Sequence, residues 1–116
     1  MRRSSNKLSP SLKNQLIKTF AQNISDLNEI DEAFTFLNDF FTEAELEIFA
    51  KRLAIAYWLK KGRSYTNIKN NLKVSSATIA SVAAKADTEG ISLSMKKFEA
   101  EEWATVWEKK IKKFLG

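Results

Sequence analysis

YTNIKNNLKVSSATIASVAA, residues 65–84, is the stretch that decides the fold. Its apolar side chains fall at helical spacing on either side of a turn: Ile68 and Leu72 before it, Val74 within it, and Ile79 and Val82 after it. Two short helices that pack across each other through a tight turn form a helix-turn-helix. The turn departs from the usual pattern, since Lys73 stands where glycine is common. We therefore predict a helix-turn-helix over residues 64–86.

The second short helix has the features of a helix that enters a DNA groove. Ser75 or Ser76 can cap it, because a serine hydroxyl accepts a hydrogen bond from the first turn. Its first turn would then point at the bases, and the cations around it suit phosphates. Lys60 and Lys61, just upstream, are expected to meet phosphates as well. The residues that we expect at the DNA are Arg63, Thr66, Lys69, Lys73, Ser75, Ser76, Ala77, Thr78, Ser81 and Lys85.

Two helices are predicted near the start of the chain. Ser9-Pro10 can begin the first, because proline is tolerated in a first helical turn. A turn at residues 25–28 separates it from the second. The apolar stripes are Leu12, Leu16, Ile17, Phe20 and Ile24 in the first helix, and Ile30, Ala33, Phe34, Leu37 and Phe41 in the second.

A third helix is predicted over residues 43–61. Thr42 and Glu45 fit a capping box at its start. Gly62 follows at the position where a left-handed residue ends a helix. Apolar residues lie on more than one side, which indicates a helix that is central to a core or shared between subunits.

The C-terminal segment is predicted to contain an amphipathic helix over residues 94–115. It begins with an irregular stretch at residues 89–91. The helical stripe contains Phe98, Trp103, Val106, Trp107, Ile111 and Phe114. Two tryptophans on one face are usually core or interface anchors. The segment could cap a dimer, cover the DNA-binding face or recruit another protein.

Composition argues against several classes of function. A chain of 116 residues makes one domain, or a small domain with arms, and three Gly and one Pro are too few for the turns of an all-β fold. The absence of Cys and His removes thiolate chemistry, the usual general base and the commonest metal ligands. No glycine-rich phosphate loop is present. We expect that the protein is not an enzyme and that it has no cofactor and no metal site.

Charge is arranged in blocks along the chain, which carries a net charge of +5. Residues 1–25 and 51–73 contain no acid, whereas residues 26–50 contain no base. Basic blocks suit a polyanion, although each could also be a solvated surface. No apolar run is long enough to span a membrane. We expect a cytoplasmic protein with no membrane partner.

The stretches TEAELEIFAKRLAIAYWLKKGRSY (42–65) and SSATIASV (75–82) resemble the Trp repressor superfamily, most closely its YerC/YecD-like branch. The resemblance extends from about Ile30 to Asp87. It implies an all-α, Trp-repressor-like intertwined helical homodimer that binds operator DNA through paired helix-turn-helix units. The implied division is a Trp-repressor-like helical domain over residues 1–87, followed by a C-terminal linker and amphipathic helix over residues 88–116.

The tryptophan pocket of that family is only partly matched. Two arginines, two threonines and a glycine hold the amino acid there, and Thr42, Arg52 and Thr78 fall on matching positions. Ser81 stands at the second arginine position, and it cannot supply a charged fork for a carboxylate. Val82 adds bulk at the glycine position, where an indole would lie. Tryptophan is not expected as a ligand.

Two hypotheses follow. The first is a transcriptional regulator that binds double-stranded DNA as a homodimer. The outer residues of the second short helix offer hydroxyls and methyls rather than bidentate groups: Ser76, Ala77, Ala80, Ser81 and Ala84. The alternative is therefore a helical dimerisation or protein-interaction module that has lost sequence-specific DNA reading.

Overall fold

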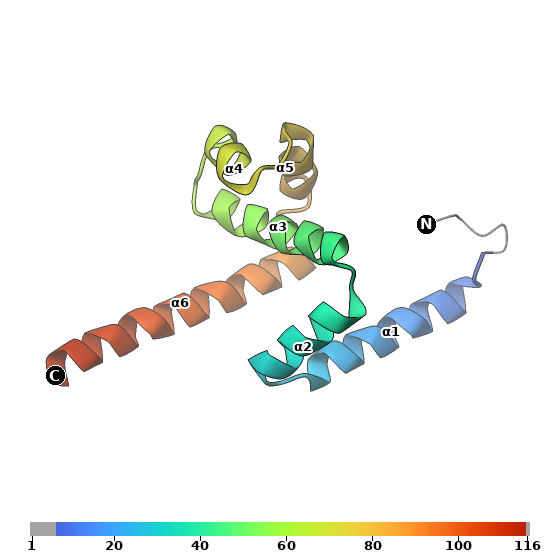
Figure 1. The fold of residues 1–116 in the computed structure, drawn as a ribbon, viewed down its shortest axis with the longest axis horizontal. Coiled ribbons are helices and arrows are strands. Elements are labelled where there is room, and N and C mark those ends of the chain that lie inside the picture. Colours follow the sequence, from blue (N-terminus) through green and yellow to red (C-terminus); the bar gives the residue numbers. More distant parts are fainter. Residues whose placement is uncertain (1–6, 116) are drawn as a thin grey trace. The chain divides into compact units, whose positions relative to one another are not determined.

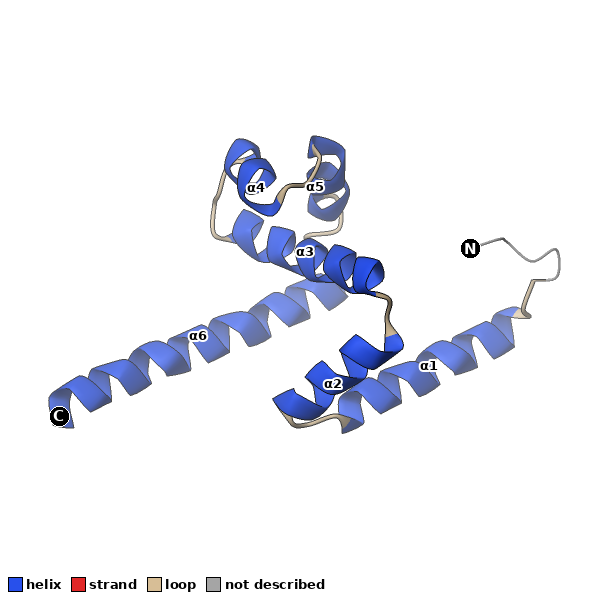
Figure 2. Ribbon diagram, viewed as in Figure 1, coloured by secondary structure: helices blue, strands red, loops and turns tan. Residues whose placement is uncertain are grey.

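The structure, a computed structural model, describes the backbone of residues 7–115 and the side chains of residues 7–102. Over this range the chain is all-helical and has no strand, which confirms the predicted fold class (Figure 1, Figure 2). The elements are α1 (Pro10–Asp26), α2 (Ile30–Phe40), α3 (Glu43–Lys60), α4 (Tyr65–Leu72), α5 (Ser76–Ala83) and α6 (Glu89–Leu115). Within the part of the chain that the structure describes, no helix is both long enough and apolar enough to cross a membrane.

Local chemistry sets the start of the first and third helices as predicted. Ser9 caps α1, since its hydroxyl accepts a hydrogen bond from the Leu12 N–H at 3.1 Å. The capping box of α3 is also formed. The Glu45 N–H donates to the Thr42 hydroxyl at 3.1 Å, and the Thr42 N–H donates to the Glu45 carboxylate at 2.9 Å. These hydrogen bonds from Thr42 lower the pKa of Glu45 below its usual value.

The chain divides into two compact units, Met1–Leu46 and Glu47–Gly116, which we call the N-terminal unit and the C-terminal unit. In the N-terminal unit, aromatic rings connect α1 and α2. Phe20 of α1 lies 5.6 Å from Phe40, and Phe36 stacks on Phe40 at 5.0 Å between ring centres. Yet no described side chain of residues 7–46 is buried. The predicted stripe of α1 is between 40% and 57% exposed.

The C-terminal unit has a closed core. Ile55 of α3, Ile68 of α4 and Ile79 of α5 are completely buried. Ala56, Val82 and Met95 complete this core, and half-buried side chains of α3, α4, α6 and the turn between α4 and α5 pack against it. Each helix of the unit therefore contributes apolar side chains to one cluster. α4 and α5 lie on one side of α3, whereas α6 passes along the other side (Figure 1).

The start of α6 differs from the prediction. Residues 89–91, expected to be irregular, form its first turn. Gly90 costs a helix about 1 kcal/mol relative to alanine. The packing of Ile91 and Met95 against the core offsets this cost, since Met95 is only 3% exposed. The first turns of α6 thus belong to the core of the C-terminal unit. The predicted tryptophan stripe, Trp103 and Trp107, lies outside the described side chains, and the domain division at residue 87 stays a prediction.

Candidate nucleic-acid interface

The two short helices predicted from residues 64–86 are present as α4 and α5, and they pack against each other. Ser64 caps α4 through the Asn67 N–H, and Ser75 caps α5 through the Thr78 N–H, each at 3.1 Å. Lys73 ends α4 in the left-handed region, with φ 56° and ψ 51°. This backbone explains why glycine is common at that turn position, because a side chain there is strained. Serine caps and a left-handed turn together set the relative direction of the two helices.

The inner and outer faces of the motif separate as the apolar spacing predicts. Ile68, Ile79 and Val82 are buried, and Leu72 and Val74 are packed against them. Most of the predicted DNA-contacting residues lie at the surface of the motif. Thr78 is half-buried, and the other nine are exposed: Arg63, Thr66, Lys69, Lys73, Ser75, Ser76, Ala77, Ser81 and Lys85. Their contact with DNA stays a prediction.

Two of the predicted hydroxyls already serve the cap of α5. The Ser75 hydroxyl accepts from the Thr78 N–H and lies 2.9 Å from the Thr78 hydroxyl. These two hydroxyls therefore hold the first turn of α5. Ser76 and Ser81 keep exposed side chains on the same helix.

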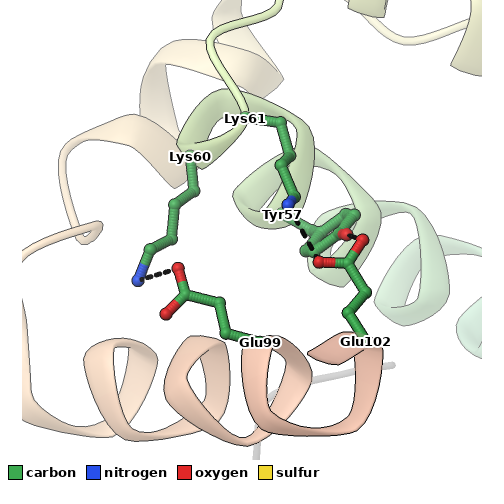
Figure 3. Close-up of polar contacts among 5 residues, drawn as sticks. All are labelled: Tyr57, Lys60, Lys61, Glu99 and Glu102. Atoms are coloured by element: carbon green, nitrogen blue, oxygen red, sulfur yellow. Dashed lines mark hydrogen bonds and ion pairs between the residues drawn. The ribbon is translucent and has the colours of Figure 1, made fainter. Parts of the chain in front are cut away.

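Lys60 and Lys61 do not have the environment that the sequence suggested. Lys60 pairs with Glu99 at 3.1 Å, and Lys61 pairs with Glu102 at 2.8 Å (Figure 3). Both carboxylates come from α6, on the side of α3 away from α4 and α5 (Figure 1). These ion pairs reduce the charge that the two lysines offer to an anion, and their contact with phosphates stays a prediction. Their charge is matched by acids that follow far along the chain.

Tyr57 completes the contact between α3 and α6. Its hydroxyl donates to the Glu102 carboxylate, and its ring lies 5.3 Å from that of Phe98 (Figure 3). Hydrogen bonds from Lys61 and Tyr57 lower the pKa of Glu102, whereas the bond to Glu102 raises the pKa of Lys61 and that of Tyr57. The spacing of Glu99 and Glu102, three residues apart on one helix, is the signal that could have indicated this face.

The cations within and beside the helix-turn-helix are not paired with carboxylates of α6 in this way. Lys69, Lys73 and Lys85 are exposed and form no ion pair with a described residue. Arg63 instead lies over the ring of Trp58, with 4.1 Å from the guanidinium carbon to the ring centre. The outer side of the motif therefore presents positive charge that protein carboxylates leave available to an anion.

Two of the residues that the resemblance matches to the family's tryptophan pocket line one cavity. Arg52 and Val82 line a cavity of about 230 Å³, together with Phe49, Leu53, Ala56, Lys85 and Ile91. Val82 is only 7% exposed because its side chain packs into the core. Ser81 does not line this cavity, and its side chain is exposed. Of the two substituted positions, Val82 therefore packs in the core and Ser81 lies at the outer surface.

An all-helical chain whose core orients α4 and α5 through a short turn, with a basic outer surface, falls in the class of helix-turn-helix proteins. A family model described as Trp repressor protein matches residues 15–90. The chain belongs to this family, and the resemblance predicted from the sequence is confirmed. The uncharacterized protein YerC of Bacillus subtilis (strain 168) is 34% identical over 59 residues, which supports the YerC-like branch. That match covers 51% of this chain and 57% of YerC. No solved structure matches the chain.

Proposed function

We propose that the protein is a DNA-binding transcriptional regulator that acts as a homodimer. The observation that carries this proposal is the set of exposed cations in and beside α4 and α5 that no described carboxylate pairs with, in a chain of the Trp repressor family. Lys69, Lys73 and Lys85 supply charge for phosphates, and the first turn of α5 supplies the groups nearest the bases. A DNA partner, in a chain similar to a bacterial protein, supports a cytoplasmic location.

The homodimer is supported by the N-terminal unit. Five apolar residues of α1 follow helical spacing, and all are at least 40% exposed in the single chain. Ile30 and Phe34 of α2 are 83% and 66% exposed. Apolar surface in this amount and arrangement marks an interaction site, and a second copy of the chain carries the same surface. Two copies would also pair two helix-turn-helix units for two half-sites.

The base contacts expected from α5 are of an uncommon kind. Ser76, Ala77 and Ser81 offer hydroxyl and methyl groups rather than the bidentate groups that usually read guanine or adenine. Sequence preference would then come through water, thymine methyl groups and DNA shape. Tryptophan is not proposed as an effector, since Ser81 replaces the second arginine and Val82 replaces the glycine of the pocket.

Selection from a pool of random duplex DNA at two salt concentrations tests the proposal. We expect enrichment of a two-fold-symmetric site with half-sites about one helical turn apart. The Lys69→Gln/Lys73→Gln variant should bind more weakly at all sites, with a salt slope smaller by about 0.9 per lost phosphate contact. Lys96→Gln/Lys97→Gln is the matched control, because it removes the same charge from exposed positions of α6.

A protein-interaction module is the second candidate. The small side chains on the outer face of α5 favour it, because they lack the groups that usually read base edges. A full-length chain that forms a dimer but binds no duplex at low salt contradicts the DNA function and supports this candidate. Salt-sensitive binding without any enriched sequence contradicts sequence-specific regulation but does not contradict DNA binding itself.

A further inference from the structure

We propose that Trp58 is a positioning residue for DNA binding: its indole ring holds the Arg63 guanidinium ready for a backbone phosphate at the entrance to α4. The inference rests on the proposed DNA-binding function, and it adds a residue that the sequence did not place near the DNA. Three features carry it. They are the backbone that joins α3 to α4, the stacking of the two side chains, and the charges around Arg63.

The backbone after α3 brings residues 58 and 63 together. Gly62 is left-handed, with φ +83°. Its N–H donates to the Leu59 carbonyl, and the Arg63 N–H donates to the Trp58 carbonyl, both at 3.0 Å. This pair of hydrogen bonds is the Schellman motif, in which the side chain at the Arg63 position usually makes an apolar contact back to the Trp58 position. A guanidinium over an indole takes the place of that contact here.

The guanidinium is held at two places. Its central carbon lies 4.1 Å from the centre of the Trp58 ring, within the range of a cation–π contact. Its Nη1 donates to the Asn67 side-chain oxygen in the first turn of α4, at 3.4 Å. Trp58 is itself anchored, because it packs against the buried core. The side chain of Arg63 is therefore ordered before any DNA arrives, which lowers the entropy lost on binding.

Arginine suits this position for a geometric reason. Its guanidinium is planar and carries five N–H donors, so that it can stack on a ring, bond Asn67 and still donate to a phosphate. The neighbouring Lys60 and Lys61 are each paired with a carboxylate of α6. Arg63 pairs with no carboxylate among the described residues, and it directly precedes Ser64, the cap of α4. Of the three cations Lys60, Lys61 and Arg63 before α4, Arg63 is therefore the one whose charge no described carboxylate pairs with.

A double-mutant cycle in the full-length chain tests the inference. The variants are Trp58→Leu, Arg63→Ala and the double variant, and the probe is a labelled mixed-sequence duplex read by fluorescence anisotropy. We expect Arg63→Ala to weaken binding about tenfold and to lower the salt slope by about 0.9 per protomer. Trp58→Leu should weaken binding about fivefold with an unchanged slope, because the charge remains. The double variant should bind no more weakly than Arg63→Ala.

Matched controls separate positioning from general stability. Tyr57→Leu removes a neighbouring half-buried ring that faces α6, and it should leave DNA affinity within about twofold of the wild type. Trp58→Phe keeps an aromatic face and should recover most of the affinity. If Trp58→Leu does not fold, Arg63→Lys is measured instead. It keeps the charge but cannot stack as a planar group, so that affinity should fall while the slope stays.

The outcomes distinguish this inference from the proposed function. A wild-type chain that binds no duplex at low salt overturns the DNA function, and the inference with it. A wild-type chain that binds, with additive effects of Trp58→Leu and Arg63→Ala, overturns the inference alone. Equal losses for Tyr57→Leu and Trp58→Leu also overturn it, because both rings would then act only through stability.

Discussion

The two units of the chain have apolar side chains at the same helical spacing but bury them very differently. Three isoleucines of the C-terminal unit are completely buried, whereas every residue of the α1 stripe in the N-terminal unit is at least 40% exposed. Spacing therefore predicts which face of a helix is apolar, but it does not say whether the same chain covers that face. The C-terminal unit buries a core of its own, although Ile48, Phe49 and Leu53 of α3 remain 42–55% exposed. The N-terminal unit has apolar surface left over for a partner, which we propose to be a second copy.

Ile17→Glu gives the largest expected effect and tests this difference directly. Ile17 is 57% exposed, so the single chain should tolerate the change to within about 0.5 kcal/mol. In a dimer that covers the α1 stripe, the same change buries an unpaired carboxylate, and the dimer Kd should rise by at least about 100-fold. Analytical ultracentrifugation across a concentration series measures the shift.

Gln15→Glu is the matched control for this experiment. It adds the same charge to α1 but lies off the apolar stripe, at an exposed position. It should leave the dimer Kd unchanged. Equal behaviour of the two variants, or a wild-type chain that remains a monomer, contradicts the proposal that a second copy covers the N-terminal unit.

Met95→Ala tests the other half of the comparison. Met95 of α6 is 3% exposed and belongs to the core, so its truncation should destabilise the C-terminal unit by about 2–3 kcal/mol. Leu93→Ala, two residues earlier on the same helix, removes a side chain that is 57% exposed and should cost less than about 0.5 kcal/mol. Urea denaturation followed by tryptophan fluorescence compares the two variants. Equal costs contradict a core that includes α6.

The sequence predicts the parts of this fold that depend on neighbouring residues. The Ser9 and Ser75 caps, the Thr42–Glu45 capping box and the left-handed Gly62 each involve residues at most a turn or two apart. Their chemistry is visible in a short window. The inner face of α4 and α5 was predictable for the same reason, because a helical period fixes which side chains share a side.

Contacts between distant segments were not predictable. Residues 89–91 carry a glycine and suggest irregular backbone, but the burial of Met95 against helices far upstream makes them helical. Lys60 and Lys61 lie in an acid-free stretch, and only the fold shows that Glu99 and Glu102 neutralise them. The stacking of Arg63 on Trp58 was missed although it is local. Gly62 predicts the left-handed end of α3, but the residue after such a glycine usually makes an apolar contact, and an arginine at that position does not indicate one.

Glu102→Gln gives the smallest expected effect on stability. Together with a variant in the N-terminal unit, it compares how the stability of the two units depends on pH. Lys61 and Tyr57 hold the pKa of Glu102 below its usual 4.5, so the stability from this contact is present above pH 4.5 and is lost as pH falls through the lowered pKa. Glu102 also raises the pKa of Lys61 above its usual 10.5. That contribution is complete below pH 10.5 and is lost as pH rises through the raised value.

Removal of the Glu102 charge should therefore flatten both the acid and the alkaline ends of the stability profile of the C-terminal unit. Glu45→Gln in the N-terminal unit is the contrasting variant. The pKa of Glu45 is lowered by hydrogen bonds from Thr42 and not by a cation, so that its loss should flatten the acid end alone. Urea denaturation at a series of pH values measures both profiles. An alkaline end that is unchanged by Glu102→Gln would show that the contact between α3 and α6 does not persist in solution, and that the core residues of α6 hold this helix without it.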